Sequence, residues 1–229
     1  MRFLAKVAVL SALVATPSAA QTGTFKFLAG SSVYAWGVSV GTYKGVLDGK
    51  NIDIWCVDFQ NHISPGNQFT VNVTGLGTGA NLSNTRFGNL AGQPSAYRQA
   101  AWLASQFRTQ ATTEWGYIHA AIWNLTSGFG ANFTGNNQAK LTYWLNQASS
   151  NYSKYSYNNA YVLTDTRLNR CQAAAPSGMP WNGCGKQEQL YLDGGLTPVP
   201  EPATMGLMAI GLVAMSGMGW VRRRRQRQA

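Results

Sequence analysis

The chain has 229 residues, of which 45% are hydrophobic and 11% are charged, and its 18 basic and 8 acidic side chains give a formal net charge of +10. Seven of the basic residues and one acidic residue lie in residues 1–20 and 199–229, so residues 21–198 carry only about +4. Their basic residues are scattered singly, which argues against a continuous basic stripe along a phosphate backbone, and nucleic acid is not an expected partner.

The N-terminus has the pattern of a secretory signal peptide. Arg2 and Lys6 precede an apolar stretch over residues 7–14, and small residues stand at Ser18 and Ala20. We expect signal peptidase to cut after Ala20. The body of the protein is then residues 21–198, a size typical of one domain with its own core.

Several segments of the body have the composition of β-strands. The first covers residues 33–40, which are rich in β-branched and aromatic side chains, and further strands are predicted at residues 69–73, 161–163 and 189–192. Residues 44–47 and 50–57 flank Asp48-Gly49, the signal for a hairpin with a type I′ turn. Because side chains alternate along a strand, Cys56 shares one face with Ile52 and Ile54, and its thiol is expected to point inward.

Three helices are predicted between the early and late strands. The first covers residues 94–108, the second begins with Thr113 as its N-cap and ends at residues 127–128, and the third begins at Asn136 or Asn137. Strands, then helices, then strands predict an α+β fold that is mainly β. A β-sandwich or a small barrel would carry an inserted layer of about three helices.

Three cysteines in an exported chain leave one cysteine unpaired. Cys171 and Cys184 bracket a loop rich in proline and glycine, so we predict a disulfide between them, which contributes about 3 kcal/mol in the chain-entropy treatment. Cys56 is then a free thiol, either a small buried apolar residue or a reactive group.

The C-terminal residues combine three features in a fixed order. Val199-Pro200-Glu201-Pro202 is followed by an uncharged, mainly apolar run at residues 203–221, and then by Arg222, Arg223, Arg224 and Arg225. A helix over this run reaches roughly 28 Å, enough to cross a bilayer once. The arginines are expected to stay on the cytoplasmic side, which places the body outside the cytoplasm.

This order resembles the PEP-CTERM sorting signal of Gram-negative bacteria. The resemblance implies that the partner is an exosortase, a membrane transpeptidase-like enzyme that cuts near the Pro-Glu-Pro. The precursor is then anchored in the inner membrane with its body in the periplasm, and processing passes the body to the cell surface or the extracellular matrix. A eukaryotic glycolipid-anchor signal is the rival interpretation, but such tails end in apolar residues, whereas this one ends in arginines and glutamines.

Two motifs in the body resemble the paired motifs of bacterial surface thioester domains. They are Trp55-Cys56-Val57-Asp58 and, about sixty residues later, His119-Ala120-Ala121-Ile122-Trp123. In that family the cysteine sulfur attacks a glutamine amide in the helix motif, expels ammonia and leaves an internal thioester that traps amines. Here His119 stands at the glutamine position and has no acyl carbon, so the resemblance implies a retained scaffold without a Cys56–His119 thioester. Gln99 is an alternative acyl donor, with a spacing to tryptophan one residue short of the family pattern.

A Cys56–His119 pair would also suit an enzyme. The imidazole could take the thiol proton and leave a nucleophile for hydrolysis or acyl transfer, with Asp58 or Asn124 orienting the ring. A histidine on an apolar helix stripe is more often a hydrogen-bonded core residue, and this is the role we expect. The other histidine, His62, gives no recognised ligand spacing with these residues, so no metal or other cofactor is expected.

Aromatic residues are the candidate contacts for a ligand, because sugars stack on exposed rings. Tyr152, Tyr155 and Tyr157 lie in a Ser/Asn-rich segment that cannot easily bury three rings, and Trp181 lies in the cysteine-bounded loop. We therefore expect a noncovalent interaction or matrix protein, associated with exopolysaccharide or biofilm, rather than an enzyme. The alternative is a Cys56-dependent covalent adhesin, or a Cys-His hydrolase or acyl-transfer enzyme.

Overall fold

The computed structural model describes residues 21–88, 92, 94–129, 133–167 and 185–199. The predicted signal peptide with its cleavage site at Ala20, the Cys171–Cys184 pair, Trp181 and the tail from residue 200 onward lie outside these described residues. Within the described part of the chain, no helix is both long enough and apolar enough to cross a membrane.

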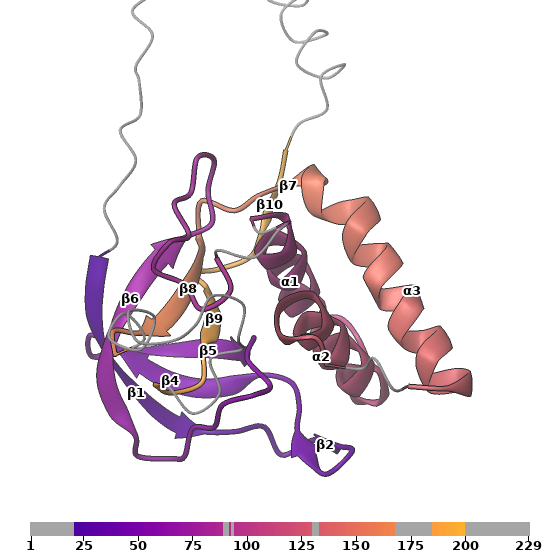
Figure 1. The fold of residues 1–229 in the computed structure, drawn as a ribbon, viewed down its shortest axis with the longest axis horizontal. Helices are drawn as coiled ribbons and strands as arrows, with labels where there is room; N and C mark the ends of the chain where they lie inside the picture. The colour runs from indigo at the N-terminus through magenta and orange to yellow at the C-terminus, as the bar shows by residue number, and fades with distance from the viewer. Residues whose placement is uncertain (1–20, 89–91, 93, 130–132, 168–184, 200–229) are drawn as a thin grey trace, which may run out of the picture.

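Six strands close into a barrel in the order β1-β4-β5-β9-β8-β6, and all neighbours are antiparallel (Figure 1). The strands are β1 (Gln21–Ala29), β4 (Tyr43–Leu47), β5 (Lys50–Cys56), β6 (Gln68–Gly75), β8 (Ala160–Asp165) and β9 (Gln189–Leu192). Closure pairs every strand on both sides and leaves the barrel without a free edge. The prediction of a mainly β fold with a small barrel and about three helices is confirmed, and the sandwich alternative is not formed.

The hairpin of β4 and β5 matches its prediction. Asp48 and Gly49 adopt φ angles of 49° and 83°, as a type I′ turn requires at both central positions. Ile52, Ile54 and Cys56 are buried together, with Cys56 wholly shielded from solvent. The alternating residues of β5 therefore point into the interior of the barrel, as the sequence predicts.

The N-terminal part of the body departs from the prediction. β1 is absent from the predicted strands, although Phe25 and Phe27 alternate with exposed residues along it. The prediction of one strand over residues 33–40 is wrong, because the chain forms a small hairpin of β2 (Tyr34–Ala35) and β3 (Val38–Ser39). Its turn residues Trp36 and Gly37 have φ angles of 50° and 79°, which no continuous strand accommodates.

Three helices lie together against one side of the barrel (Figure 1). They are α1 (Ser95–Gln106), α2 (Thr112–Ser127) and α3 (Gly135–Asn151), and α1 contacts β9 as well as the other two helices. The predicted N-caps are wrong, since Ala111 and Thr134 precede α2 and α3 without a side-chain cap hydrogen bond. A run of adjacent polar residues at each start leaves the position of the cap undetermined, whereas Gly128 ends α2 as predicted.

The helices cover a second apolar face of the barrel wall. Trp55, Leu190 and Val162 stand opposite one another on β5, β9 and β8, and all three are buried. They point away from the interior that holds Ile54 and Cys56, because successive side chains of a strand alternate. β5 is thus packed on both faces, which explains the continuous burial from Ile54 to Cys56.

A two-stranded sheet lies where α3 ends. A 3₁₀ turn, Tyr152–Lys154, leads into β7 (Tyr155–Ser156), which pairs with β10 (Thr197–Pro198). The amide of Val199 donates to the carbonyl of Lys154 at 2.7 Å. The last described residues are therefore bound to the body.

Candidate functional site

Cys56 ends β5 with its thiol enclosed by the protein. The thiol donates to the carbonyl oxygen of Asp58 at 3.2 Å, and Sγ accepts a hydrogen bond from the indole Nε1 of Trp123 at 3.3 Å. Burial, aided by the Asp58 carboxylate, raises the pKa of the Cys56 thiol far above its usual range. The group is a neutral, hidden thiol, in contrast to the partly exposed thiolates of reactive cysteines.

His119 joins two backbone segments. Its Nδ1 accepts a hydrogen bond from the amide of Gly41 at 2.9 Å, which places the ring proton on Nε2, 3.0 Å from the carbonyl oxygen of Cys56. The ring also stacks on Trp123, with centroids 4.3 Å apart. Burial lowers the pKa of His119 to about 3, so the ring is neutral at ordinary pH.

In the predicted Cys-His pair, His119 therefore contacts the backbone carbonyl of Cys56 and not its thiol. Both ring nitrogens of His119 bond to main-chain groups, so neither is placed to take the proton of Cys56 Sγ. This is the contact pattern of a hydrogen-bonded core histidine. Gln99, the alternative acyl donor, lies half-buried on α1, whereas the hydrogen-bond partners of Sγ are Trp123 and Asp58.

Asp58 belongs to a buried ionic contact. Its Oδ2 lies 2.8 Å from Nε of Arg86, with 1% of the arginine side chain and none of the aspartate side chain exposed. The carboxylate also accepts from the side chain of Asn61 at 2.8 Å. It therefore orients Arg86 and the loop after β5, not the ring of His119. Asn124, the other predicted orienting residue, also has a different partner, because its side-chain amide donates to the carbonyl of Phe129.

Glu188 lies wholly buried beside this pair. It accepts hydrogen bonds from the amide of Arg86, the hydroxyl of Tyr97 and the hydroxyl of Thr164. Burial raises the pKa of the Glu188 carboxyl. Glu188 thus connects the loop before α1 to the segment that enters β9. Its hydrogen-bond partners are all buried groups of the protein itself, which indicates a structural role.

The remaining histidine is separate from this centre. His62 is exposed in the loop that follows β5, while Cys56 and His119 are fully buried. Among the residues that the structure describes, no group of three or more histidine, cysteine or acidic side chains is placed to hold a metal ion.

The tyrosine cluster is less exposed than the sequence predicts. Tyr157 is only 5% exposed and its hydroxyl donates to the carbonyl of Tyr152 at 2.6 Å, while Tyr152 and Tyr155 are half-buried. The reason is that the 3₁₀ turn carrying Tyr152 packs against α1. These tyrosines line a cleft of about 400 Å³, and Val199 also lines it.

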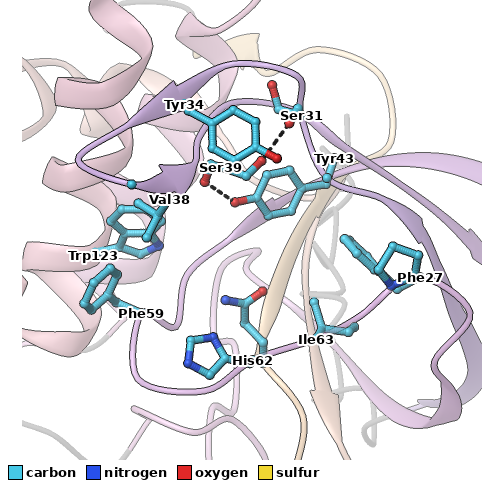
Figure 2. A pocket seen from close by; sticks show the side chains of 14 residues that line it. Phe27, Ser31, Tyr34, Val38, Ser39, Tyr43, Phe59, His62, Ile63 and Trp123 are labelled. Atoms are coloured by element: carbon cyan, nitrogen blue, oxygen red, sulfur yellow. Dashed lines mark hydrogen bonds between the residues drawn. The ribbon is translucent and has the colours of Figure 1, made fainter.

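A larger cavity, of about 500 Å³, opens between the β2–β3 hairpin, the loop after β5 and α2 (Figure 2). Its walls include Tyr34, Tyr43, Phe59, His62, Trp123 and Gln187. None of these residues stands among the predicted ligand contacts. A signal for it was present in Tyr34-Ala35-Trp36-Gly37, where a glycine inside an aromatic segment marks a turn that exposes its neighbours.

Residues 198–225 match the family model of the PEP-CTERM protein-sorting motif. The chain carries an exosortase sorting signal. The match confirms the predicted sorting signal, and its range contains Pro200, Glu201, Pro202 and Arg222 to Arg225. It begins at Pro198, the last residue of β10. The protein is thus exported as a membrane-anchored precursor that is processed for the cell surface.

No curated protein and no solved structure is significantly similar to the chain. The likeness of the body to thioester domains therefore stays a prediction. In the structure, Nε1 of Trp123 on α2 donates a hydrogen bond to Sγ of Cys56 at the end of β5.

Proposed function

We propose that the processed body is a noncovalent interaction protein of the extracellular matrix, which binds exopolysaccharide or another biofilm component and is not an enzyme. The sorting signal at residues 198–225 carries this proposal, because exosortase processing delivers the body to the place where such material lies.

The chemistry around Cys56 favours binding over catalysis. A thiol nucleophile needs a thiolate and a path to its substrate. Cys56 is wholly buried with a raised pKa, and His119 is held neutral by the same burial. Both side chains instead support the packing of α2 on β5.

The junction between body and signal also suits a processed product. β10 pairs with β7 immediately before the Pro-Glu-Pro, and the barrel strands all lie upstream of it. A cut near Glu201 would leave these pairings in place. The released product would be a complete domain.

Co-sedimentation with isolated extracellular matrix tests this function. The purified processed protein and a Cys56→Ala variant are both expected to pellet with the matrix, because the variant loses packing and the buried hydrogen bond from Trp123 but no surface group. A wild-type protein that stays in the supernatant contradicts the proposal. So does a Cys56→Ala variant that keeps the native circular dichroism spectrum but no longer pellets.

A second candidate is covalent chemistry at Cys56, which one observation favours. The register of β5 and β9 places Gln189 directly opposite Cys56, and such opposed side chains have Cβ atoms about 4.5–5.5 Å apart. Within the described residues, the buried Oε1 of Gln189 has no hydrogen-bond partner. Attack of Sγ on the Gln189 carboxamide would form a thioester, with the thiol proton leaving in the released ammonia.

Intact mass distinguishes this candidate. A mass short by one ammonia, with Cys56 resistant to alkylation under denaturing conditions, would establish the thioester. A mass that shows no loss of ammonia, with an alkylatable Cys56, excludes it. A Gln189→Glu variant is the matched control, because its carboxyl group offers no ammonia to lose.

A further inference from the structure

We propose that the cavity between the β2–β3 hairpin and α2 is a binding site for a neutral saccharide unit. This inference rests on the proposed function and assigns it a site. The cavity of about 500 Å³ lies within the range of about 300–1,000 Å³ usual for small-molecule pockets.

Aromatic rings surround the opening from several sides. Figure 2 shows Tyr34 and Tyr43 on one side of the cavity and Trp123 with Phe59 on another. Tyr34 is 70% exposed, the highest exposure among the large apolar and aromatic side chains of the described residues. Its ring therefore keeps open surface beside a hollow, where the apolar faces of a sugar ring can stack.

The hairpin that carries Tyr34 is held in place by its tip. Trp36 packs against Phe133 and Tyr117, with ring centroids 4.8 Å and 5.6 Å apart. It does so with a φ of 50°, a conformation that is disfavoured for a bulky residue and persists where packing enforces it. The wall is thus rigid before a ligand arrives, which lowers the entropic cost of binding.

Hydrogen bonds fix the base of the same hairpin. The hydroxyl of Tyr43 donates to the carbonyl of Ser39 at 2.6 Å, and the hydroxyl of Ser39 donates to the carbonyl of Ser31 at 2.9 Å. The Gly41 amide is bonded to His119 on α2. These contacts set the distance between the hairpin and Trp123 across the cavity.

The polar character of the walls selects the ligand class. Ser31, Ser39 and His62 supply polar atoms, and none of the described lining residues is Asp, Glu, Lys or Arg. A neutral ligand with hydroxyl groups matches this mixture of rings and uncharged polar groups. A quaternary ammonium ion also binds in aromatic cages, but it has no hydrogen-bond donor or acceptor to pair with the polar groups of these walls.

Affinity electrophoresis of the purified processed protein through gels containing dextran, laminarin or mannan tests the site, with alginate as the acidic comparison. We expect retardation in at least one neutral gel, unaffected by tetramethylammonium. Tyr34→Ala and His62→Ala, both at exposed positions, are expected to weaken apparent affinity, about tenfold for Tyr34→Ala. Tyr143→Ala, another exposed tyrosine, is the matched control and should bind as the wild type does.

Matrix co-sedimentation tests the proposed function separately from this site. Three results of the gel experiment would overturn the inference. They are no retardation in any neutral gel, competition by tetramethylammonium, and unchanged binding by Tyr34→Ala. Loss of binding in Tyr155→Ala with Tyr34→Ala unaffected would move the site to the tyrosine cleft. Failure of the wild type to pellet with matrix would instead count against the proposed function itself.

Discussion

Nε2 of His119 lies 3.0 Å from the carbonyl oxygen of Cys56, while Nδ1 of the same ring accepts the amide of Gly41. One side chain on α2 thus fastens the end of β5 and the start of the segment leading into β4. Residues next to these two segments, Tyr43 and Phe59, line the cavity between the β2–β3 hairpin and α2. The histidine in the helix motif therefore has a structural task, because it joins two backbone segments that are far apart along the chain.

The first prediction concerns the pH dependence of stability. His119 has a folded pKa of about 3 against an ordinary value of 6.5, so its stabilising contribution is complete above pH 6.5. It is lost as the pH falls toward 3, by about 1.4 kcal/mol per pH unit. Between pH 7 and pH 5, the urea unfolding free energy of the wild type should fall by about 2 kcal/mol more than that of His119→Gln.

His62→Gln provides the control for this experiment, because His62 is exposed. As a surface substitution, it should leave the unfolding free energy at pH 7 within about 0.5 kcal/mol of the wild-type value. If the unfolding free energies of the wild type and His119→Gln changed equally with pH, His119 would not titrate as its burial demands.

Arg86→Met should be strongly destabilising. The change leaves the carboxylate of Asp58 buried without its counter-charge, which costs about 3–5 kcal/mol. Lys44→Met breaks an ion pair with Asp53 in which the side chains are 61% and 41% exposed, and should cost less than about 1 kcal/mol. Urea denaturation compares the two, and similar losses would mean that the buried pair is no stronger than the exposed one.

Gly41→Ala and Gly37→Ala separate backbone strain from steric conflict. Gly37 has a φ of 79° with open space around it, so an alanine there should cost about 1 kcal/mol. Gly41 has a φ of 107°, and an added Cβ would lie 2.4 Å from the ring of Trp115. We expect a larger loss of melting temperature for Gly41→Ala, and a smaller one would indicate that Trp115 moves freely.

The cysteines can be assigned by mass spectrometry. The processed protein is expected to weigh two hydrogens less than its reduced form, with a disulfide between Cys171 and Cys184. Alkylation without reductant should modify Cys56 alone, and only after denaturation, because the native thiol is buried. Rapid modification of Cys56 in the native protein would contradict its burial.

Replacing Arg222 to Arg225 with glutamine should block sorting. The cluster lies inside the matched signal, and its charge is expected to hold the tail on the cytoplasmic side. An uncut precursor should accumulate on immunoblots of membrane fractions. Arg227→Gln lies beyond the matched residues and should be processed normally. Normal processing of the four-glutamine variant would remove the arginines from the recognition step.

Prediction succeeded where a property depends on neighbouring residues. The hairpin at Asp48-Gly49 follows from two adjacent residues that tolerate positive φ, and the inward thiol of Cys56 follows from strand alternation. The same kind of pattern misled at residues 33–40, where β propensity suggested one strand but Trp36 and Gly37 turn the chain. Burial of Tyr157 depends on packing against another segment, which its own polar surroundings do not reveal.

The sequence by itself determined the sorting signal, the β-rich class and the presence of three helices, because each depends on an order or period within a short stretch. Only the tertiary structure decided what His119 does, since its partners Cys56 and Gly41 are 63 and 78 residues away along the chain. The cavity near Tyr34 likewise joins a hairpin, a loop and a helix. Burial and hydrogen-bond partners arise from chain segments meeting in space, and no local pattern specifies which segments meet.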